Sequence, residues 1–275
     1  MEQKAGINSR GDSLQQVVEE AVRKALDGAL NLEEERPSPR SFATQTEPYP
    51  DRKFPVEAIF PKETDHSLWW TKGINAIAAN IKLKMGEGKK RAILFTSSTS
   101  GEGTTTVCSH VSLALARVYT GNVLLLDCNA QHPEIHTLFN TETAPGLTDI
   151  LTERMPWADA VRKSNLKNFF ILPFGPPLQE PLSLLGSEAM EGLLNNLKTD
   201  FDFLFLDAPP VLRSSEAEMI LPWVEASVLI IKAHTTRREV VMRAVERLIR
   251  HKEFMGAVLN QQEFMIPKFI YQRLK

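Results

Sequence analysis

The feature that most constrains the fold is a succession of strand, loop and helix signals at residues 92–118. Residues 92–96 form a continuous apolar run, and the next ten residues read S-S-T-S-G-E-G-T-T-T. Apolar residues then recur at helical spacing, at Val107, Val111, Leu115 and Val118. A buried strand that leads through glycines into a helix is typical of loops that bind phosphate, because the helix N-terminus presents backbone N–H groups without partners.

This phosphate-binding loop, residues 97–106, departs from the usual pattern at one position. Thr104 stands where a lysine normally reaches the β- and γ-phosphate oxygens. A glycine- and serine-rich stretch taken alone is more simply a solvated turn. The flanking strand and helix favour the phosphate-binding interpretation, which predicts nucleotide contacts from Ser100, Gly101, Glu102, Gly103, Thr104, Thr105 and Thr106.

Strand and helix signals alternate through the rest of the chain. The predicted strands are apolar throughout rather than alternating, as expected of strands buried on both faces; they cover residues 92–96, 123–127, 169–174, 203–207, 227–232 and 256–259. The predicted helices cover residues 105–119, about 157–163, 188–198, about 215–221 and 237–250. The alternation predicts an α/β fold with a doubly wound, mostly parallel sheet and helices on both faces.

Two predicted strands end in aspartate, Asp127 and Asp207. One such aspartate by itself is explained equally well as the cap of a following helix. Ligands of parallel sheets bind at the carboxyl ends of the strands, and Mg²⁺ takes carboxylate and hydroxyl oxygens beside phosphates. The two aspartates and the loop together therefore predict one Mg-nucleotide site, with Thr105, Asp127 and Asp207 as metal ligands and both aspartates as catalytic candidates.

Three segments are predicted along the chain: an N-terminal helix at residues 1–32, a proline-rich linker at 33–65 and a P-loop NTPase-like domain at 66–275. Apolar residues recur on one helical face between Leu14 and Leu30. This helix either packs on its own core or docks on another protein, and the sequence does not separate the two. Residues 33–65 carry repeated prolines, which indicates an extended tether.

Composition excludes several classes of protein. A formal net charge of −2 argues against nucleic acid as the main partner. Two cysteines form no disulfide framework and suit a reducing compartment. No segment approaches the roughly 18 apolar residues of a membrane span, and the first residues lack the apolar stretch of a secretory signal. We therefore expect a cytoplasmic chain that reaches the inner face of the membrane through a partner.

The motifs resemble those of bacterial tyrosine kinases, a branch of the deviant-Walker P-loop ATPases. Residues 96–106 are similar to that family's loop T-S-x-x-P-G-E-G-K-[ST]-T, residues 123–133 to V-L-L-I-D-x-D-x-R-x-P, and residues 206–210 to its D-x-P-P segment. The connecting segments at 145–151, 175–185, 235–239 and 258–260 are similar as well. The resemblance extends from about residue 74 to 261 and sets the chain apart from partition and septum-positioning ATPases, which share the short motifs.

The resemblance implies an ATP/ADP and Mg²⁺ site to which Asn260 contributes. It also implies a membrane polysaccharide copolymerase as partner, in capsule or exopolysaccharide production. Several departures indicate a degenerate member of the family. Thr104 replaces the lysine and Asn129 replaces the second aspartate. Where the family has a tyrosine-rich C-terminal tail, this chain has a single tyrosine, Tyr271. At the three positions of the family's ring-forming E-x-x-R-x-x-R motif this chain has Lys72, Asn75 and Ala78, so that interface is not expected. The sequence leaves open whether the chain forms another homo-oligomer.

We therefore expect an ATPase-like component that docks on or regulates a copolymerase, with weak or no catalysis and weak nucleotide binding. One alternative is an active ATP-dependent tyrosine autokinase that controls polysaccharide chain length. A second alternative is a partition or septum-positioning ATPase.

Overall fold

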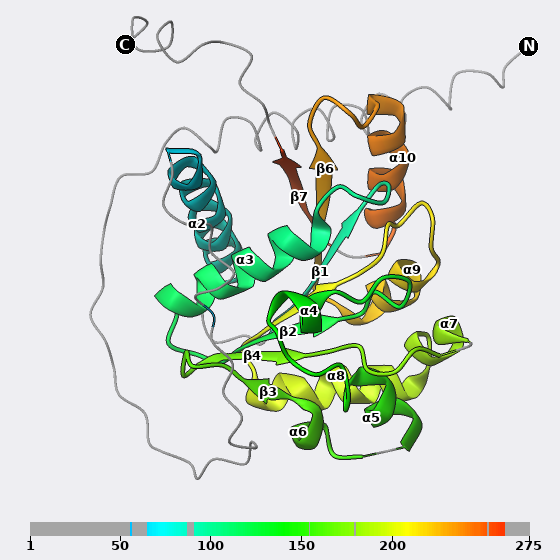
Figure 1. The fold of residues 1–275 in the computed structure, drawn as a ribbon. Coiled ribbons are helices and arrows are strands. Elements are labelled where there is room, and N and C mark those ends of the chain that lie inside the picture. The colour runs from blue at the N-terminus through cyan, green and yellow to red at the C-terminus, as the bar shows by residue number, and fades with distance from the viewer. Residues whose placement is uncertain are drawn as a thin grey trace, which may run out of the picture.

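The computed structural model describes residues 56, 65–86, 91–153, 155–178, 180–251 and 253–261. These residues form one sheet between two layers of helices (Figure 1). The predicted N-terminal helix, the predicted linker apart from Val56 and Asp65, and the C-terminal tail lie outside the described residues. Within the described ranges, no helix combines the length and apolar character that crossing a membrane requires.

Seven strands build this sheet, in the order β3-β4-β2-β5-β1-β6-β7. All neighbours are parallel except β3, which is antiparallel to β4 at one edge. This confirms the predicted doubly wound, mostly parallel fold. The strands are β1 (Arg91–Ser97), β2 (Val123–Asp127), β3 (Arg162–Lys163), β4 (Phe169–Leu172), β5 (Phe203–Asp207), β6 (Ala226–Lys232) and β7 (Glu253–Asn260).

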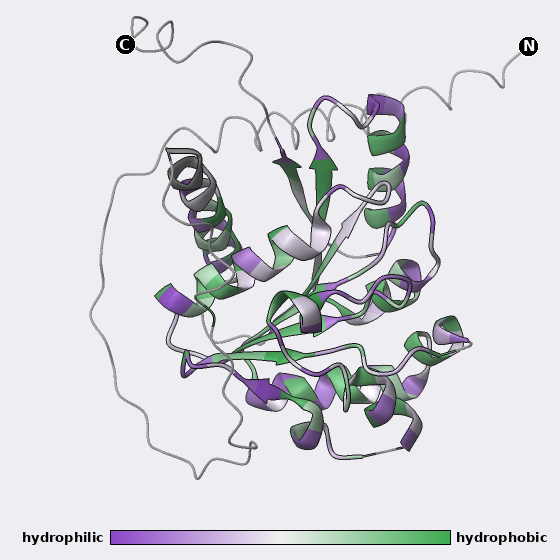
Figure 2. Ribbon diagram, viewed as in Figure 1, coloured by the Kyte–Doolittle hydropathy of each residue, from purple (hydrophilic) through white to green (hydrophobic). Residues whose placement is uncertain are grey.

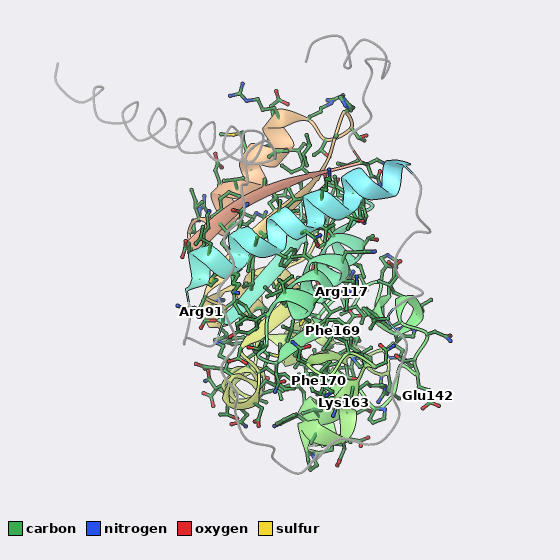
Figure 3. All side chains as sticks on the ribbon, turned by 90° about the vertical axis from the view of Figure 1, so that its left-hand side faces the viewer. Arg91, Arg117, Glu142, Lys163, Phe169 and Phe170 are labelled. Atoms are coloured by element: carbon green, nitrogen blue, oxygen red, sulfur yellow. The ribbon has the colours of Figure 1, made fainter. Side chains whose placement is uncertain are left out.

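Helices cover both faces of the sheet. One face carries α2 (Asp65–Met85), α3 (Thr104–Val118) and α4 (Ile135–Leu138), and α2 lies across the front of Figure 3 beside α3. The other face carries α5 (Leu147–Glu153), α6 (Trp157–Ala160), α7 (Pro181–Leu185), α8 (Glu188–Asp200), α9 (Glu216–Ile220), the 3₁₀ helix η2 (Leu221–Trp223) and α10 (Arg238–Leu248).

The strands divide their side chains between these two layers because successive residues of a strand point to opposite faces. In β1, Ala92 and Leu94 pack against the α8 side, whereas Ile93 and Phe95 pack against α2 and α3. Figure 2 shows the resulting hydrophobic strands at the centre of the molecule. Both faces being covered explains why the sequence signals are continuous apolar runs.

Several elements differ from the sequence prediction, among them the short helices α4, α5 and α7, which were not expected. The predicted helix at 157–163 ends at Ala160, because Arg162 and Lys163 pair with β4 as a short edge strand. Helix α2 was not expected, and its buried residues Ile74, Ala78 and Ile81 belong to the core layer under α3. Ala78 is 1% exposed. The third position of the family's ring motif therefore faces this chain's own core.

One residue of the predicted linker is fixed to the domain. Val56 is buried in the same layer as α2, and its backbone N–H donates to Asn165 Oδ1 at 3.3 Å. Nearby, Asn168 Nδ2 lies within hydrogen-bond distance of the carbonyl oxygens of Ala116, Tyr119 and Gly121. This amide closes the C-terminus of α3, whose last carbonyl groups have no partner within the helix.

Candidate functional site

The strand order brings the predicted site residues to one edge of the sheet. Strand β5 lies between β2 and β1, and Asp207 is the register neighbour of both Asp127 and Phe95. Backbone hydrogen bonds continue beyond the strand ends, with Cys128 N–H donating to Asp207 O at 2.8 Å and Ala208 N–H to Phe95 O at 2.9 Å. The phosphate-binding loop and the two aspartates are therefore adjacent, as the sequence predicts.

The loop has a backbone shape that suits an anion. Gly101 and Gly103 have φ angles of +79° and +86°, a region that favours glycine. Helix α3 begins at Thr104, and its N-cap Gly103 offers no side-chain cap. The first-turn N–H groups of α3, on Thr104, Thr105 and Thr106, therefore have no partner within the helix. Such groups and the helix dipole stabilise a bound phosphate.

The predicted contact residues of the loop do not all face the same way. Ser100, Gly101 and Thr106 are exposed, and Gly103, Thr104 and Thr105 are half-buried. Glu102 is buried, with 2% of its surface exposed, and its carboxylate turns into the protein. Its Oε2 accepts the N–H groups of Ser98 at 2.6 Å and Thr99 at 2.9 Å. Glu102 thus holds the loop from inside through its side chain.

Asp127 is buried and accepts two backbone hydrogen bonds. Its Oδ1 accepts Asn129 N–H and its Oδ2 accepts Ile135 N–H, both at 3.1 Å. Burial nevertheless raises the pKa of Asp127 from 3.8 to about 7, and these two N–H donors oppose part of the rise. The carboxylate therefore orders the segment after β2 in addition to facing the site.

Asp207 lies beside Asp127 but lacks comparable backbone N–H donors. The residue is 0% exposed, and no donor in the described part of the chain completes a hydrogen bond of normal geometry with either carboxylate oxygen. Burial raises the pKa of Asp207 well above its usual value, the Asp127 charge adds to the rise, and the nearby Thr105 hydroxyl opposes it. A buried carboxylate without a partner is costly unless a cation pairs with it.

The geometry therefore fits a hard divalent cation. Asp207, Asp127 and the Thr105 hydroxyl supply oxygen atoms beside the N-terminus of α3, and Mg²⁺ prefers such ligands together with phosphate oxygens and water. In the described ranges no group of three or more His, Cys, Asp or Glu side chains gathers into a metal site, so this candidate rests on two carboxylates and a hydroxyl. Cys108 and Cys128 are free and buried, and burial raises the pKa of both thiols.

The two asparagines singled out by the sequence hold the backbone. Asn129 Oδ1 accepts His132 N–H at 3.2 Å, within the segment after β2. Asn260 is buried at the end of β7, where its Nδ2 donates to Glu102 O at 2.8 Å and its Oδ1 accepts Gln261 N–H at 2.9 Å. A side chain at Gly103 would collide with this Asn260 amide. Asn260 thus contacts the loop directly.

Sequence reasoning missed the residues that meet Glu102 from the other side. Its Oε1 accepts the Thr236 hydroxyl and, at 3.4 Å, the backbone N–H of Lys232. Lys232 is the last residue of β6 and Thr236 lies in the turn after it, more than a hundred positions along the chain from Glu102. A lone glutamate between two glycines gives no sequence signal for such a contact.

The fold and the loop define a P-loop nucleotide-binding domain, and the family model described as AAA domain matches residues 90–262. The tyrosine-protein kinase YwqD of Bacillus subtilis is 30% identical over 185 residues, covering 67% of this chain and 78% of that protein. The kinase domain of VpsO is 30% identical, with a TM-score of 0.64, over 69% of this chain and 94% of that one.

A structure of the septum site-determining protein MinD from Pyrococcus horikoshii, in complex with Mg-ADP, shares the fold. Its identity is 22% and its TM-score 0.54, over 67% of this chain and 77% of that one. The higher identity and TM-score of the VpsO kinase domain agree with the motif comparison. The chain belongs to the bacterial tyrosine-kinase family of P-loop ATPases.

Proposed function

We propose that the chain is an ATPase-like component of a capsule or exopolysaccharide system that docks on, or regulates, a membrane polysaccharide copolymerase. In this proposal it binds ATP or ADP with Mg²⁺ weakly and turns ATP over weakly or not at all. It is cytoplasmic and reaches the inner face of the membrane through that partner. Membership of the kinase family supports the system, and the site supports the reduced catalysis.

The observation that carries the proposal is the residue that begins α3. In phosphoryl transfer the loop lysine places a full positive charge on the β- and γ-phosphate oxygens. Thr104 offers one neutral hydroxyl at that point. Removing a single positioned donor from an active site lowers the rate by about 10²–10³-fold, and removing a full charge should lower it at least as much. Asn129 removes a further carboxylate from the surroundings.

The remaining parts of the site favour binding over turnover. The first-turn N–H groups of α3 hold a phosphate by hydrogen bonds whatever the side chains are. Asp127 and Asp207 stay in place, and Thr105 stands at the helix start beside Asp207. Bound Mg²⁺ would offset the two buried carboxylates and polarise the phosphate oxygens.

The test uses the purified full chain with ATP and Mg²⁺. We expect ATP hydrolysis and tyrosine phosphorylation at background, with nucleotide binding detectable by calorimetry. The Asp127→Asn variant is the control for contaminating kinase. Tyrosine phosphorylation by the wild type that disappears in Asp127→Asn would overturn the proposal of weak catalysis. Absence of binding in both wild type and Thr104→Lys would overturn the proposed nucleotide site.

The second candidate function is an active tyrosine autokinase. It is favoured by the relatives at 30% identity, YwqD and the VpsO kinase domain, both of which are called kinases. Both strand-end aspartates of the motif are also present in this chain. Phosphorylation confined to Tyr271, measured by mass spectrometry, would support this candidate.

A further inference from the structure

The phosphate-binding loop is held by a carboxylate of its own. The Glu102 side chain, 2% exposed, accepts hydrogen bonds at both oxygens. Oε2 accepts Ser98 N–H at 2.6 Å and Thr99 N–H at 2.9 Å, from the first half of the loop. Oε1 accepts the Thr236 hydroxyl, from the turn between β6 and α10, and the N–H of Lys232, the last residue of β6. We call these four hydrogen bonds the Glu102 brace.

The brace joins the loop to the end of β6 and its following turn, and further hydrogen bonds connect both to the end of β7. Lys232 and Thr236 close the turn after β6, where Thr236 N–H donates to Lys232 O at 3.2 Å. The same turn is tied to β7 by Ala233 N–H, which donates to Asn260 O at 2.8 Å. Asn260 then returns to the loop through Glu102 O. The loop, the turn and the end of β7 are therefore connected by one continuous hydrogen-bond network.

The network satisfies backbone N–H groups that would lack a partner in a phosphate-binding loop without ligand. Loop N–H groups that point inward are satisfied by the phosphate when it is bound, and without it they lose a partner inside the protein. Here a buried carboxylate satisfies Ser98 and Thr99 permanently, and hydrogen bonds to a charged acceptor are the stronger kind. The N–H groups at the start of α3 stay available for a ligand.

We propose that Glu102 is a positioning residue that keeps the phosphate-binding loop in its ligand-ready shape when the site is empty, and that Thr236 transmits this order to the turn after β6. Because Thr104 supplies no charge to attract phosphate, binding depends on a cradle that is already formed, since ordering a loop during binding weakens affinity. The expected effect on nucleotide affinity rests on the proposed nucleotide site, whereas the expected effect on the order of the loop does not.

The test compares Glu102→Ala with Glu225→Ala in the full chain. Glu225 Oε2 accepts Ala92 N–H at 2.6 Å, so it also holds β1 through a backbone hydrogen bond, at the end away from the loop. Amide hydrogen exchange is measured first. We expect exchange at Ser98 and Thr99 to be at least tenfold faster in Glu102→Ala than in wild type, and unchanged in Glu225→Ala. Equal exchange in wild type and Glu102→Ala would overturn the inference.

Nucleotide affinity is measured second, by titration with Mg-ADP in chains that keep Thr104, with Thr104→Lys as the positive control for binding. We expect Glu102→Ala to weaken binding at least tenfold, and Glu225→Ala to leave it unchanged even if it lowers the melting temperature. Unchanged affinity in Glu102→Ala would overturn the positioning role. If Thr104→Lys itself binds no nucleotide, the proposed function fails, and the exchange result alone decides the brace.

The Thr236→Val variant keeps the test valid if Glu102→Ala does not fold. It removes one hydroxyl and leaves the Ser98 and Thr99 hydrogen bonds in place. We expect binding of Mg-ADP to weaken by about threefold to fivefold, with faster exchange at Lys232 N–H. Wild-type exchange and affinity in Thr236→Val would overturn the proposed link to the turn after β6.

Discussion

Replacing Asp207 by asparagine should stabilise the protein in the absence of nucleotide and metal. Asp207 is buried, receives no completed hydrogen bond among the described residues, and lies in register with a second buried carboxylate. The Asp207→Asn variant keeps the size of the side chain and removes its charge. The new amide can donate to Asp127, which has lone pairs beyond those used by Asn129 and Ile135.

The magnitude follows from the neighbouring carboxylate. Asp127 has two N–H donors, and its pKa is still raised from 3.8 to about 7, which corresponds to about 4 kcal/mol against the charged form. Asp207 lacks such donors, and burial and the Asp127 charge raise its pKa well above its usual value, which also opposes its charged form. Leaving a polar amide buried offsets about 1–3 kcal/mol of the gain. We expect a net increase of about 1–3 kcal/mol in the free energy of unfolding near pH 8.

The pH dependence has a definite sign. A carboxyl group whose pKa is higher in the folded state binds more protons when folded, so its contribution to stability is greatest below the unfolded pKa. For Asp127 that contribution is lost as pH rises from about 4 through about 7. Wild type should therefore lose stability over this range, and Asp207→Asn should lose less because one of the two buried charges is gone.

Urea unfolding at pH 5 and pH 8, followed by circular dichroism, measures both effects. The exposed Asp200 provides a control, since Asp200→Asn should change the unfolding free energy by less than about 0.5 kcal/mol. Added Mg²⁺ should stabilise wild type more than Asp207→Asn. A loss of stability in Asp207→Asn at pH 8, without Mg²⁺, would refute the view that Asp207 is an unpaired buried charge.

Three further predictions concern the loop, the core and the N-terminal segment. Thr104→Lys should raise affinity for Mg-ATP by tenfold or more, about 1.4 kcal/mol, and by less for Mg-ADP, because the lysine also reaches γ-phosphate oxygens; calorimetry with Thr104→Gln as the uncharged control measures this. Asn168→Ala should lower the free energy of unfolding by about 1–3 kcal/mol, because the carbonyl oxygens at the end of α3 lose their amide donor; equal urea midpoints would contradict this. Deleting residues 1–35 should release the protein from membranes in cell fractionation and change the melting temperature of the domain little, because Val56 and its contact with Asn165 are retained. A melting temperature lower by several degrees, with membrane association intact, would instead assign the helix to the core.

Much of the fold was predictable because its signals are local. Each parallel strand is apolar throughout, so β2 and β5 were predicted with their observed bounds. Strand β3 was missed because two residues carry no periodic signal and become a strand only by pairing with β4. Helix α2 was missed although its buried residues complete one core layer, since its apolar face becomes evident only when α3 lies against it.

The sequence by itself determined the parts of the candidate site that follow directly from a strand: the loop after β1, Thr104 in the lysine position, and the aspartates that end β2 and β5. Only the tertiary structure decided which of these residues meet and which groups satisfy them. Strand order places Asp207 beside Asp127, and chain folding brings Thr236 and Asn260 to Glu102, 134 and 158 positions away. Such contacts depend on which strands become neighbours. That choice is made by burying both sheet faces at once, and no short stretch of sequence records it.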